Sequence, residues 1–169
     1  MFTATTSVEE LHALIDEQGR PYQMRLFEDD HAWTLKVFDD HALVAQVNCL
    51  VQGSDLFLAD IHVFDAARHP LRRVQQFKGW LGFDVSGRTE NYQHRGLGTE
   101  LIKFVIRRAR DRGLLRVTGR LFPKDLEANP RLPGWYRHQG FQVAMNESGT
   151  AGELELVLSD FEEEGCPPD

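Results

Sequence analysis

Residues 93–99, Gln-His-Arg-Gly-Leu-Gly-Thr, run directly into an apolar periodic stretch that predicts a helix. The first turn of a helix leaves backbone N–H groups without internal partners, and glycines let that backbone curl around an anion. Each hydrogen bond to a charged oxygen is worth ~1.5–3 kcal/mol, against ~0.3–1 kcal/mol for the helix dipole. Several backbone amides that point at one anion therefore contribute more to its binding than the helix dipole does. A pyrophosphate is the expected ligand. The candidate binding residues are Gln93, His94, Arg95, Gly96, Leu97, Gly98 and Thr99.

This loop is weak evidence by itself, because a plain tight turn before a helix can have the same residues. Residue 101 is leucine, so the dinucleotide-binding pattern Gly-x-Gly-x-x-Gly is not met. The loop also lacks the Gly-Lys-Ser/Thr of a Walker A motif. A second motif is needed to decide between a turn and a binding site.

That second motif lies at residues 129–141, where an asparagine is followed by a tyrosine and then by Gly-Phe. With both motifs at this separation, the sequence resembles the GNAT superfamily of acyl-CoA-dependent N-acetyltransferases. The resemblance covers residues 55–160 well and residues 1–54 only loosely. The pyrophosphate loop of that family reads Arg/Gln-x-x-Gly-x-Gly/Ala. Gln93, Gly96 and Gly98 match this loop. The residues that match the later motif of the family are Asn129, Tyr136, Gly140 and Phe141.

The resemblance implies an α/β (α+β) fold with a mixed, mostly antiparallel, splayed central sheet flanked by helices. Residues 1–160 are expected to form one domain, with 66–91 as an insertion or lid loop and 161–169 as a disordered acidic tail. The resemblance also implies acetyl-CoA as co-substrate, a primary amine as acceptor and no metal. Strands at 56–65 and 114–121 would hold the pantetheine arm. Main-chain groups near Ile61 and Val63 would polarise the thioester carbonyl, and Asn129 would contact the cofactor.

Two departures from the family pattern concern the acceptor. The early helix expected here precedes the strands, whereas the family places helices between its first two strands. Residues 66–91 also separate the phosphate loop from its strand. In the family, both regions usually shape the acceptor pocket. The departures therefore leave the identity of the acceptor undetermined and do not change the interpretation of the cofactor.

Acetyl transfer to an alkyl amine needs a base, because the amine titrates near 10.4 and exposing its lone pair near pH 7 costs ~4–5 kcal/mol. Asp60 and His62 share one face of the expected strand, and we expect this pair, Asp60 first, to accept that proton. A solvated polar strand face is the alternative explanation of both residues.

The leaving thiolate needs an acid. Tyr136 matches the phenol that usually fills this role in the family, although without the motif a Trp-Tyr pair on a short helix is ordinary core packing. Neither Cys49 nor Cys166 lies near a nucleophile motif, and the seven histidines have no metal-ligand spacing, so direct transfer is expected.

Periodicity and turn residues predict the elements that position these groups. A Ser-x-x-Glu capping box at Ser7 and apolar residues at helical spacing predict a helix that ends before Gly19. Gly113 is expected to end the helix at 97–112. A short helix should run from Pro133 to before Gly140. Strands are expected at 23–28, 32–38, 42–51, 56–65, 114–121, 141–145 and 153–159.

Residues 66–91 have no clear period, although 80–85 can also be interpreted as a strand. The aromatic residues of this segment could line the acceptor pocket as a lid, bury a satellite core or form a dimer contact. They are Phe77, Trp80 and Phe83.

The composition, with 41% hydrophobic and 27% charged residues among 169, is that of a single soluble domain. No membrane span or signal peptide is recognised, so a cytoplasmic location is expected. Residues 66–143 carry 16 basic and 6 acidic side chains, and residues 1–65 carry 3 and 12. A polyanion such as coenzyme A fits the basic block, and a cationic acceptor fits the acidic one, although charged surfaces facing solvent explain both.

Three classes of function remain to be compared. The first is an acetyltransferase, and the second is a non-catalytic acyl-CoA-binding domain with a regulatory or interaction role. Nucleic-acid binding by the basic helix around 103–112 is the third, but no stacking platform or recognition motif supports it. The expected partners are acetyl-CoA and an amine, without nucleic acid or membrane, and a homodimer is compatible with the sequence.

Overall fold

The computed structural model describes residues 8–64, 67–68, 89–90 and 95–158. The first strands, in chain order, are β1 (Val8–Ile15), β2 (Pro21–Glu28), β3 (Ala32–Asp39), β4 (Ala42–Gln52) and β5 (Asp55–Val63). The later elements are β6 (Ala67–Arg68), β7 (Thr89–Glu90), α2 (Leu97–Asp111), β8 (Arg116–Leu121), α3 (Pro123–Ala128), α4 (Leu132–His138), β9 (Gln142–Met145) and β10 (Gly152–Val157). Among the helices described, none is long and apolar enough to cross a membrane.

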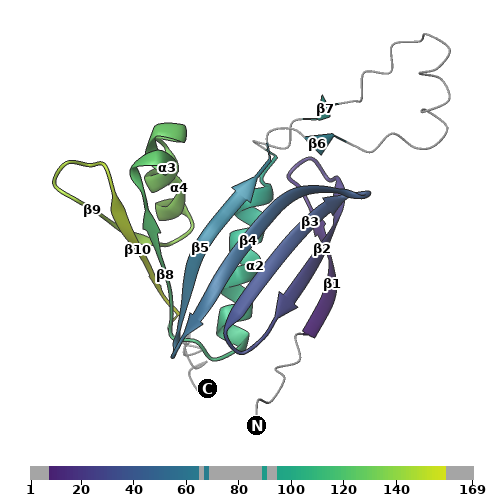
Figure 1. The fold of residues 1–169 in the computed structure, drawn as a ribbon, viewed down its shortest axis with the longest axis horizontal. Coiled ribbons are helices and arrows are strands. Elements are labelled where there is room, and N and C mark those ends of the chain that lie inside the picture. Colours follow the sequence, from purple (N-terminus) through teal and green to yellow (C-terminus); the bar gives the residue numbers. More distant parts are fainter. Residues whose placement is uncertain (1–7, 65–66, 69–88, 91–94, 159–169) are drawn as a thin grey trace, which may run out of the picture. The chain divides into compact units, whose positions relative to one another are not determined.

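Eight strands form one mixed sheet in the order β1-β2-β3-β4-β5-β8-β10-β9. The pairs β1–β2, β2–β3, β8–β10 and β10–β9 are antiparallel, whereas β5 and β8 are parallel. The parallel register runs from Asp55↔Arg116 to Leu58↔Gly119, although β5 itself continues to Val63. The fold class predicted from the sequence, a mostly antiparallel mixed sheet flanked by helices, is confirmed (Figure 1).

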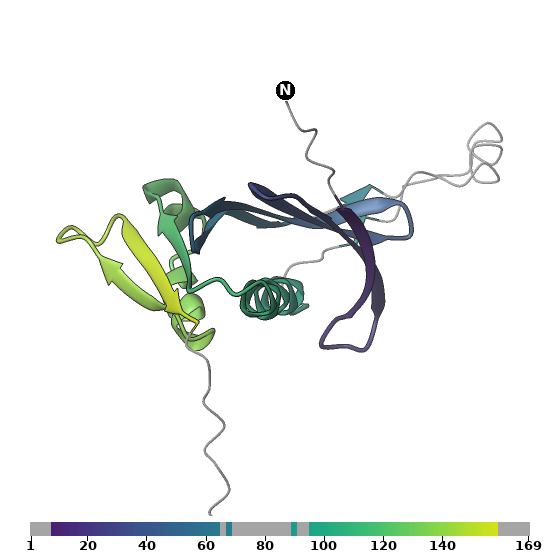
Figure 2. The ribbon, with the colours of Figure 1, turned by 90° about the horizontal axis from the view of Figure 1, so that it is seen from below.

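The described residues form two compact units. The first takes its residues from 1–48 and 60–101, and the second takes its residues from 49–59 and 102–169. In the first unit, one face of the β2–β3 hairpin forms the core, because side chains alternate across a strand. Leu26, Trp33, Leu35 and Val37 are all at most 1% exposed. Figure 2 shows the β1–β2 hairpin curling out of the plane of β3.

The second unit pairs β8, β10 and β9, with α3 and α4 beside them (Figure 1). Its core contains Val117 and Leu154 together with two aromatic rings, Tyr136 and Phe141, all at most 3% exposed. The turn from β9 to β10 is closed by a hydrogen bond from Gly149 N to Asn146 O of 2.9 Å.

Helix α2 ends where the sequence predicts. Gly113 has φ +68°, which only glycine adopts without strain, and Leu114 N donates to Ala109 O at 3.0 Å. This six-residue bond is the Schellman motif, which satisfies a carbonyl that the helix leaves open. The strands predicted at 23–28, 32–38, 42–51 and 56–65 are all found, with ends shifted by one or two residues.

The helix predicted between Ser7 and Gly19 is wrong, because Val8–Ile15 is strand β1. Leu14 is buried, whereas Leu11 and Ile15 are 62% and 59% exposed, so alternate side chains face opposite sides of a strand. The apolar spacing follows the period of a helix rather than that of a strand. Pairing with β2, in which His12 faces Met24, decides between them, and such non-local pairing overrides local propensity.

Helix α3 was not predicted from the sequence. Its first residue is Pro123, and the Asp125 carboxylate accepts a hydrogen bond from Phe122 N at 2.9 Å. Proline at the first helical position and an aspartate two residues later are recognisable start signals. Six residues are too few to show a helical apolar period, which is why the pattern was overlooked.

The predicted insertion at 66–91 is described only near its two ends. β6 and β7 pair antiparallel, with Ala67 opposite Glu90 and Arg68 opposite Thr89. The two ends of the segment are therefore joined by a short ribbon. Phe77, Trp80, Phe83, the alternative strand at 80–85 and the acidic tail 161–169 lie outside the described residues.

Candidate functional site

The predicted phosphate loop turns sharply into α2. Gly96 has φ +76°, and its carbonyl accepts the first helical hydrogen bond, from Glu100 N at 3.0 Å. Leu97 is fully buried and anchors the loop, while Gly98 and Thr99 are partly exposed. An α-helix offers no internal partner to its first N–H groups, so the residues after Gly96 present donors suited to an anion. Gln93 and His94 lie outside the described residues.

Gly96 is also crowded by a side chain from the β1–β2 turn. A Cβ at residue 96 would lie 2.5 Å from Cγ of Glu17 and 2.6 Å from its Cδ and Oε1. Glu17 N donates a hydrogen bond to Arg95 O at 3.2 Å, which ties the turn to the loop. The left-handed backbone therefore favours glycine at residue 96, and an added Cβ would have to displace the flexible Glu17 side chain.

Asp16 organises the turn that carries Glu17. Its Oδ1 accepts hydrogen bonds from Gln18 N at 2.9 Å and Arg20 N at 2.8 Å, and its Oδ2 accepts one from the Tyr22 hydroxyl at 2.9 Å. Burial acts to raise the pKa of Asp16, but these three bonds and the charge of Arg95 outweigh burial, so the pKa lies below its usual value. The turn is thus built around a buried carboxylate that stays ionised.

The Arg95 side chain is engaged by the same cluster. Burial and the bond to Asp16 raise the pKa of Tyr22, while a hydrogen bond with Arg95 lowers it, and the pKa is raised overall. Next to this cluster, the Arg20 guanidinium forms an ion pair with Asp39, a buried carboxylate. The contact of Arg95 with a pyrophosphate stays a prediction. The structure shows that this arginine also joins the loop to the β1–β2 turn.

Four predicted site residues lie in sequence at the end of β5. Asp60 and His62 are exposed and project from one face of the strand, whereas Ile61 and Val63 are partly buried on the other. The His62 ring meets Phe64 edge-on, with centroids 4.7 Å apart. The shared face of Asp60 and His62 is therefore confirmed, while their role as the base stays a prediction.

Tyr136 and Asn129 belong to the second unit. Tyr136 is 3% exposed, and its ring packs edge-on against Trp135 and Phe141 at centroid distances of 4.7 and 5.4 Å. Asn129 ends α3, and its Oδ1 accepts a hydrogen bond from Arg131 N at 3.1 Å. Both residues therefore have structural roles in α4 and its approach, beside the functional roles that the resemblance assigns to them.

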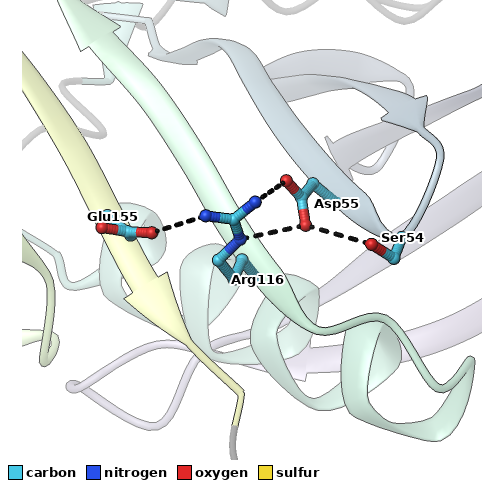
Figure 3. Close-up of polar contacts among 4 residues, drawn as sticks. All are labelled: Ser54, Asp55, Arg116 and Glu155. Carbon is cyan, nitrogen blue, oxygen red and sulfur yellow. Dashed lines mark hydrogen bonds and ion pairs between the residues drawn. The ribbon is translucent and has the colours of Figure 1, made fainter.

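A charged cluster that sequence reasoning missed holds three strands together. Figure 3 shows the Arg116 guanidinium between two carboxylates, with Nη2 2.7 Å from Asp55 Oδ2 and Nη1 3.0 Å from Glu155 Oε1. The bonds to Asp55 and then Glu155 raise the pKa of Arg116. Asp55 and Arg116 are the first pair of the parallel register, so the cluster lies where that register begins. Cross-strand spacing could have suggested it only after the parallel pairing was known.

A hollow of about 510 Å³ lies over the same part of the sheet. Its walls include Phe57, Thr118, Arg120, Gln142 and Glu153. Glu153 stands opposite Arg120 in the β8–β10 register, so a positive and a negative side chain face each other here. The hollow is open and of mixed charge, and none of the predicted site residues that the structure describes lines it.

Cys49 is unsuited to nucleophilic chemistry. It is 1% exposed, and burial raises the pKa of its thiol to about 12, which keeps it protonated near neutral pH. Cys166 lies outside the described residues. Within the described part of the chain, no group of three or more His, Cys, Asp or Glu side chains could hold a metal ion.

Comparison with known proteins identifies the family. The sequence pattern of the acetyltransferase (GNAT) family matches residues 4–141, which include the phosphate loop, Asn129 and Tyr136. The chain belongs to the GNAT acetyltransferase family. No curated protein sequence matches it. GNAT enzymes use acetyl-CoA.

Solved GNAT structures share the fold at low sequence identity. The GNAT domain of S. lividans PAT is 11% identical, with a TM-score of 0.58, and the match covers 87% of this chain and 96% of that one. The ribosomal-protein-S18-alanine N-acetyltransferase from Escherichia coli is 16% identical, with a TM-score of 0.53 and coverage of 82% and 77%. PaiA N-acetyltransferase from Thermoplasma acidophilum, solved with coenzyme A, is 13% identical, with a TM-score of 0.50 and coverage of 75% and 61%.

The Gly96→Ala variant tests the GNAT phosphate loop. The added methyl group would meet Glu17, and the left-handed backbone would be strained by ~1–2 kcal/mol. We expect coenzyme A to bind at least about tenfold more weakly in titration calorimetry, equivalent to ~1.4 kcal/mol. Gly113→Ala is the control, because Gly113 has a similar φ of +68° but nothing within 4 Å. Wild-type affinity in Gly96→Ala would refute the assignment of the loop.

The Asp16→Asn variant tests the turn that meets this loop. We expect a loss of ~1–3 kcal/mol in the free energy of unfolding at pH 7, because an amide cannot satisfy all the donors around Asp16. The pKa of Asp16 is lowered by folding, so its contribution is present above the unfolded pKa of about 3.9 and disappears as pH falls through the folded pKa. The difference between wild type and variant should therefore be constant down to about pH 5 and shrink below about pH 4.

Asp29→Asn is the matched control for this measurement. Asp29 accepts hydrogen bonds from His31 N and Ala32 N in a similar turn, but without a tyrosine hydroxyl bond among its contacts. Urea unfolding across the pH range should show a smaller loss for Asp29→Asn. Equal losses in the two variants would show that the burial of Asp16 and its bond to Tyr22 contribute nothing.

Proposed function

We propose that this GNAT protein transfers an acetyl group from acetyl-CoA directly to a primary amine. The observation that carries the proposal is the family match over residues 4–141 together with the left-handed Gly96 at the start of α2. The conformation of Gly96 fits the curl that a pyrophosphate-binding loop needs, and the N–H groups after it supply donors. Acetyl-CoA supplies the activated thioester.

The main chain of β5 is the expected second part of the donor site. Its parallel register with β8 ends at Leu58↔Gly119, and β5 continues through Ile61 to Val63. The main-chain groups near Ile61 and Val63 would bind the pantetheine amides and donate to the thioester carbonyl oxygen. Donors placed where negative charge develops lower the barrier of acyl transfer, typically by ~3–4 kcal/mol for one donor.

The exposed pair on β5 is the expected proton acceptor. Asp60 or His62, directly or through a water molecule, would take the proton that the ammonium form of the acceptor must lose before it attacks. Their exposure is consistent with a group that exchanges protons with solvent. Tyr136 is the expected proton donor to the leaving thiolate, by the match of its motif to the family.

Direct transfer is favoured over a covalent acyl-enzyme. The one cysteine within the described residues is buried, and its raised pKa keeps it a thiol rather than a thiolate. The acceptor is less narrowly defined than the acyl donor. Structures with this fold include an enzyme that acts on an alanine of ribosomal protein S18 and a nourseothricin acetyltransferase, so the fold alone does not select a small molecule or a protein.

An amine panel tests the proposed reaction. The wild-type protein is incubated with acetyl-CoA and polyamines, aminoglycosides, or peptides with free amino termini, and the release of free thiol is followed. We expect release that depends on one class of amine, with the acetylated product seen by mass spectrometry. Coenzyme A binding without turnover on any amine would instead favour the non-catalytic acyl-CoA-binding domain.

The Tyr136→Phe variant tests the acid. It removes only the hydroxyl and keeps the ring that packs on Trp135 and Phe141. We expect turnover to fall about tenfold or more, with little change in coenzyme A affinity, because the loss concerns proton transfer. An unchanged melting temperature controls for packing. Unchanged turnover would remove Tyr136 from the mechanism.

A further inference from the structure

A negative charge lies beside the loop that is proposed to bind a diphosphate. The Glu17 side chain packs so closely on Gly96 that its Oε1 would lie 2.6 Å from an added Cβ. Within the described part of the chain, no ion pair neutralises this carboxylate. An anion entering the loop must therefore approach this carboxylate.

The carboxylate and a pyrophosphate are suited to the same place for the same reason. The N-terminal end of a helix carries partial positive charge and unpaired N–H groups, which stabilise any nearby anion. In the free protein, Glu17 supplies that negative charge to the start of α2. When a diphosphate binds there, the two anions repel each other, and the repulsion is strongest where solvent screening is weakest.

The main chain of Glu17 is held in place, so its carboxylate is kept near the loop. Asp16 closes the turn through Gln18 N and Arg20 N, and Glu17 N is bonded to Arg95 O. Only the side chain of Glu17 is left to rotate, and the residue is exposed to solvent. Rotation away from Gly96 would reduce the repulsion without removing it.

We propose that Glu17 is a built-in competitor of the pyrophosphate at the Gly96 loop, lowering the affinity for acyl-coenzyme A by its charge. This inference rests on the proposed function, since it needs an acyl-CoA donor at this loop. Glu17 stabilises the start of α2 while the loop is empty of phosphate, and it favours release of coenzyme A after transfer. It is thus a residue that sets donor affinity without being a catalytic residue.

The Glu17→Gln variant tests the charge, because it keeps the size of the side chain and removes only its charge. Titration of free coenzyme A should give binding about 3- to 10-fold tighter than in wild type, and the gain should shrink at high ionic strength. A residue with a merely structural role would weaken binding when replaced. Glu17→Ala, which removes bulk as well, should also tighten binding if charge is the cause.

Glu9→Gln is the matched control. Glu9 is an exposed carboxylate in the same strand pair, near Arg25 at the other end of β1, and its replacement changes the net charge by the same amount. Its affinity for coenzyme A should equal that of wild type. Thermal unfolding of all three variants confirms that each is folded.

The possible results separate this inference from the proposed function. Wild-type protein that does not bind coenzyme A would overturn the proposed function and the inference together. Wild-type protein that binds, with Glu17→Gln equal or weaker, would overturn the inference alone. Equal tightening in Glu17→Gln and Glu9→Gln would also overturn it, because net charge and not the position of Glu17 would be the cause.

Discussion

The left-handed backbone of Gly96 is the constraint on which the candidate site depends. It lets the chain turn into α2 within one residue, and it leaves room for the Glu17 side chain where any other residue would carry a Cβ. The bond from Glu17 N to Arg95 O joins the β1–β2 turn, at a sheet edge, to the loop at the start of the helix. The left-handed glycine therefore lies where a turn and a helix start meet.

Local signals predicted most of the fold. The end of α2 at Gly113 and the strands β2 to β5 follow from residues close together in the chain, since a left-handed cap and period-two alternation are local properties. The sequence predicts a helix in place of β1 because its apolar residues follow the helical period, and only pairing with β2 makes this segment a strand. The parallel pairing of β5 with β8, which begins at Asp55 and Arg116, is likewise a product of topology.

The candidate site, like the fold, could be predicted from the sequence only in part. Gly96 and Gly98 could be proposed as a phosphate loop from the sequence alone, because such a loop is continuous in the chain. The place of Glu17 could not be predicted, because no residue near it in the chain indicates a contact with Gly96. That contact forms only once β1 and β2 have paired and the turn has closed around Asp16. The carboxylate that bears most directly on anion binding therefore belongs to the region that resembles the family only loosely.

The same structure changes how the blocks of charge should be interpreted. The acidic N-terminal region contains Asp16, which is buried in a turn, and Asp39, which is paired with Arg20. In the basic block, Arg116 is already held by two carboxylates. These charges are used in folding, so net charge over a block overstates what is left for a ligand. The side chains that the proposed acceptor amine would meet are local and exposed, and on β5 the candidates are Asp60 and His62, which share one face of the strand.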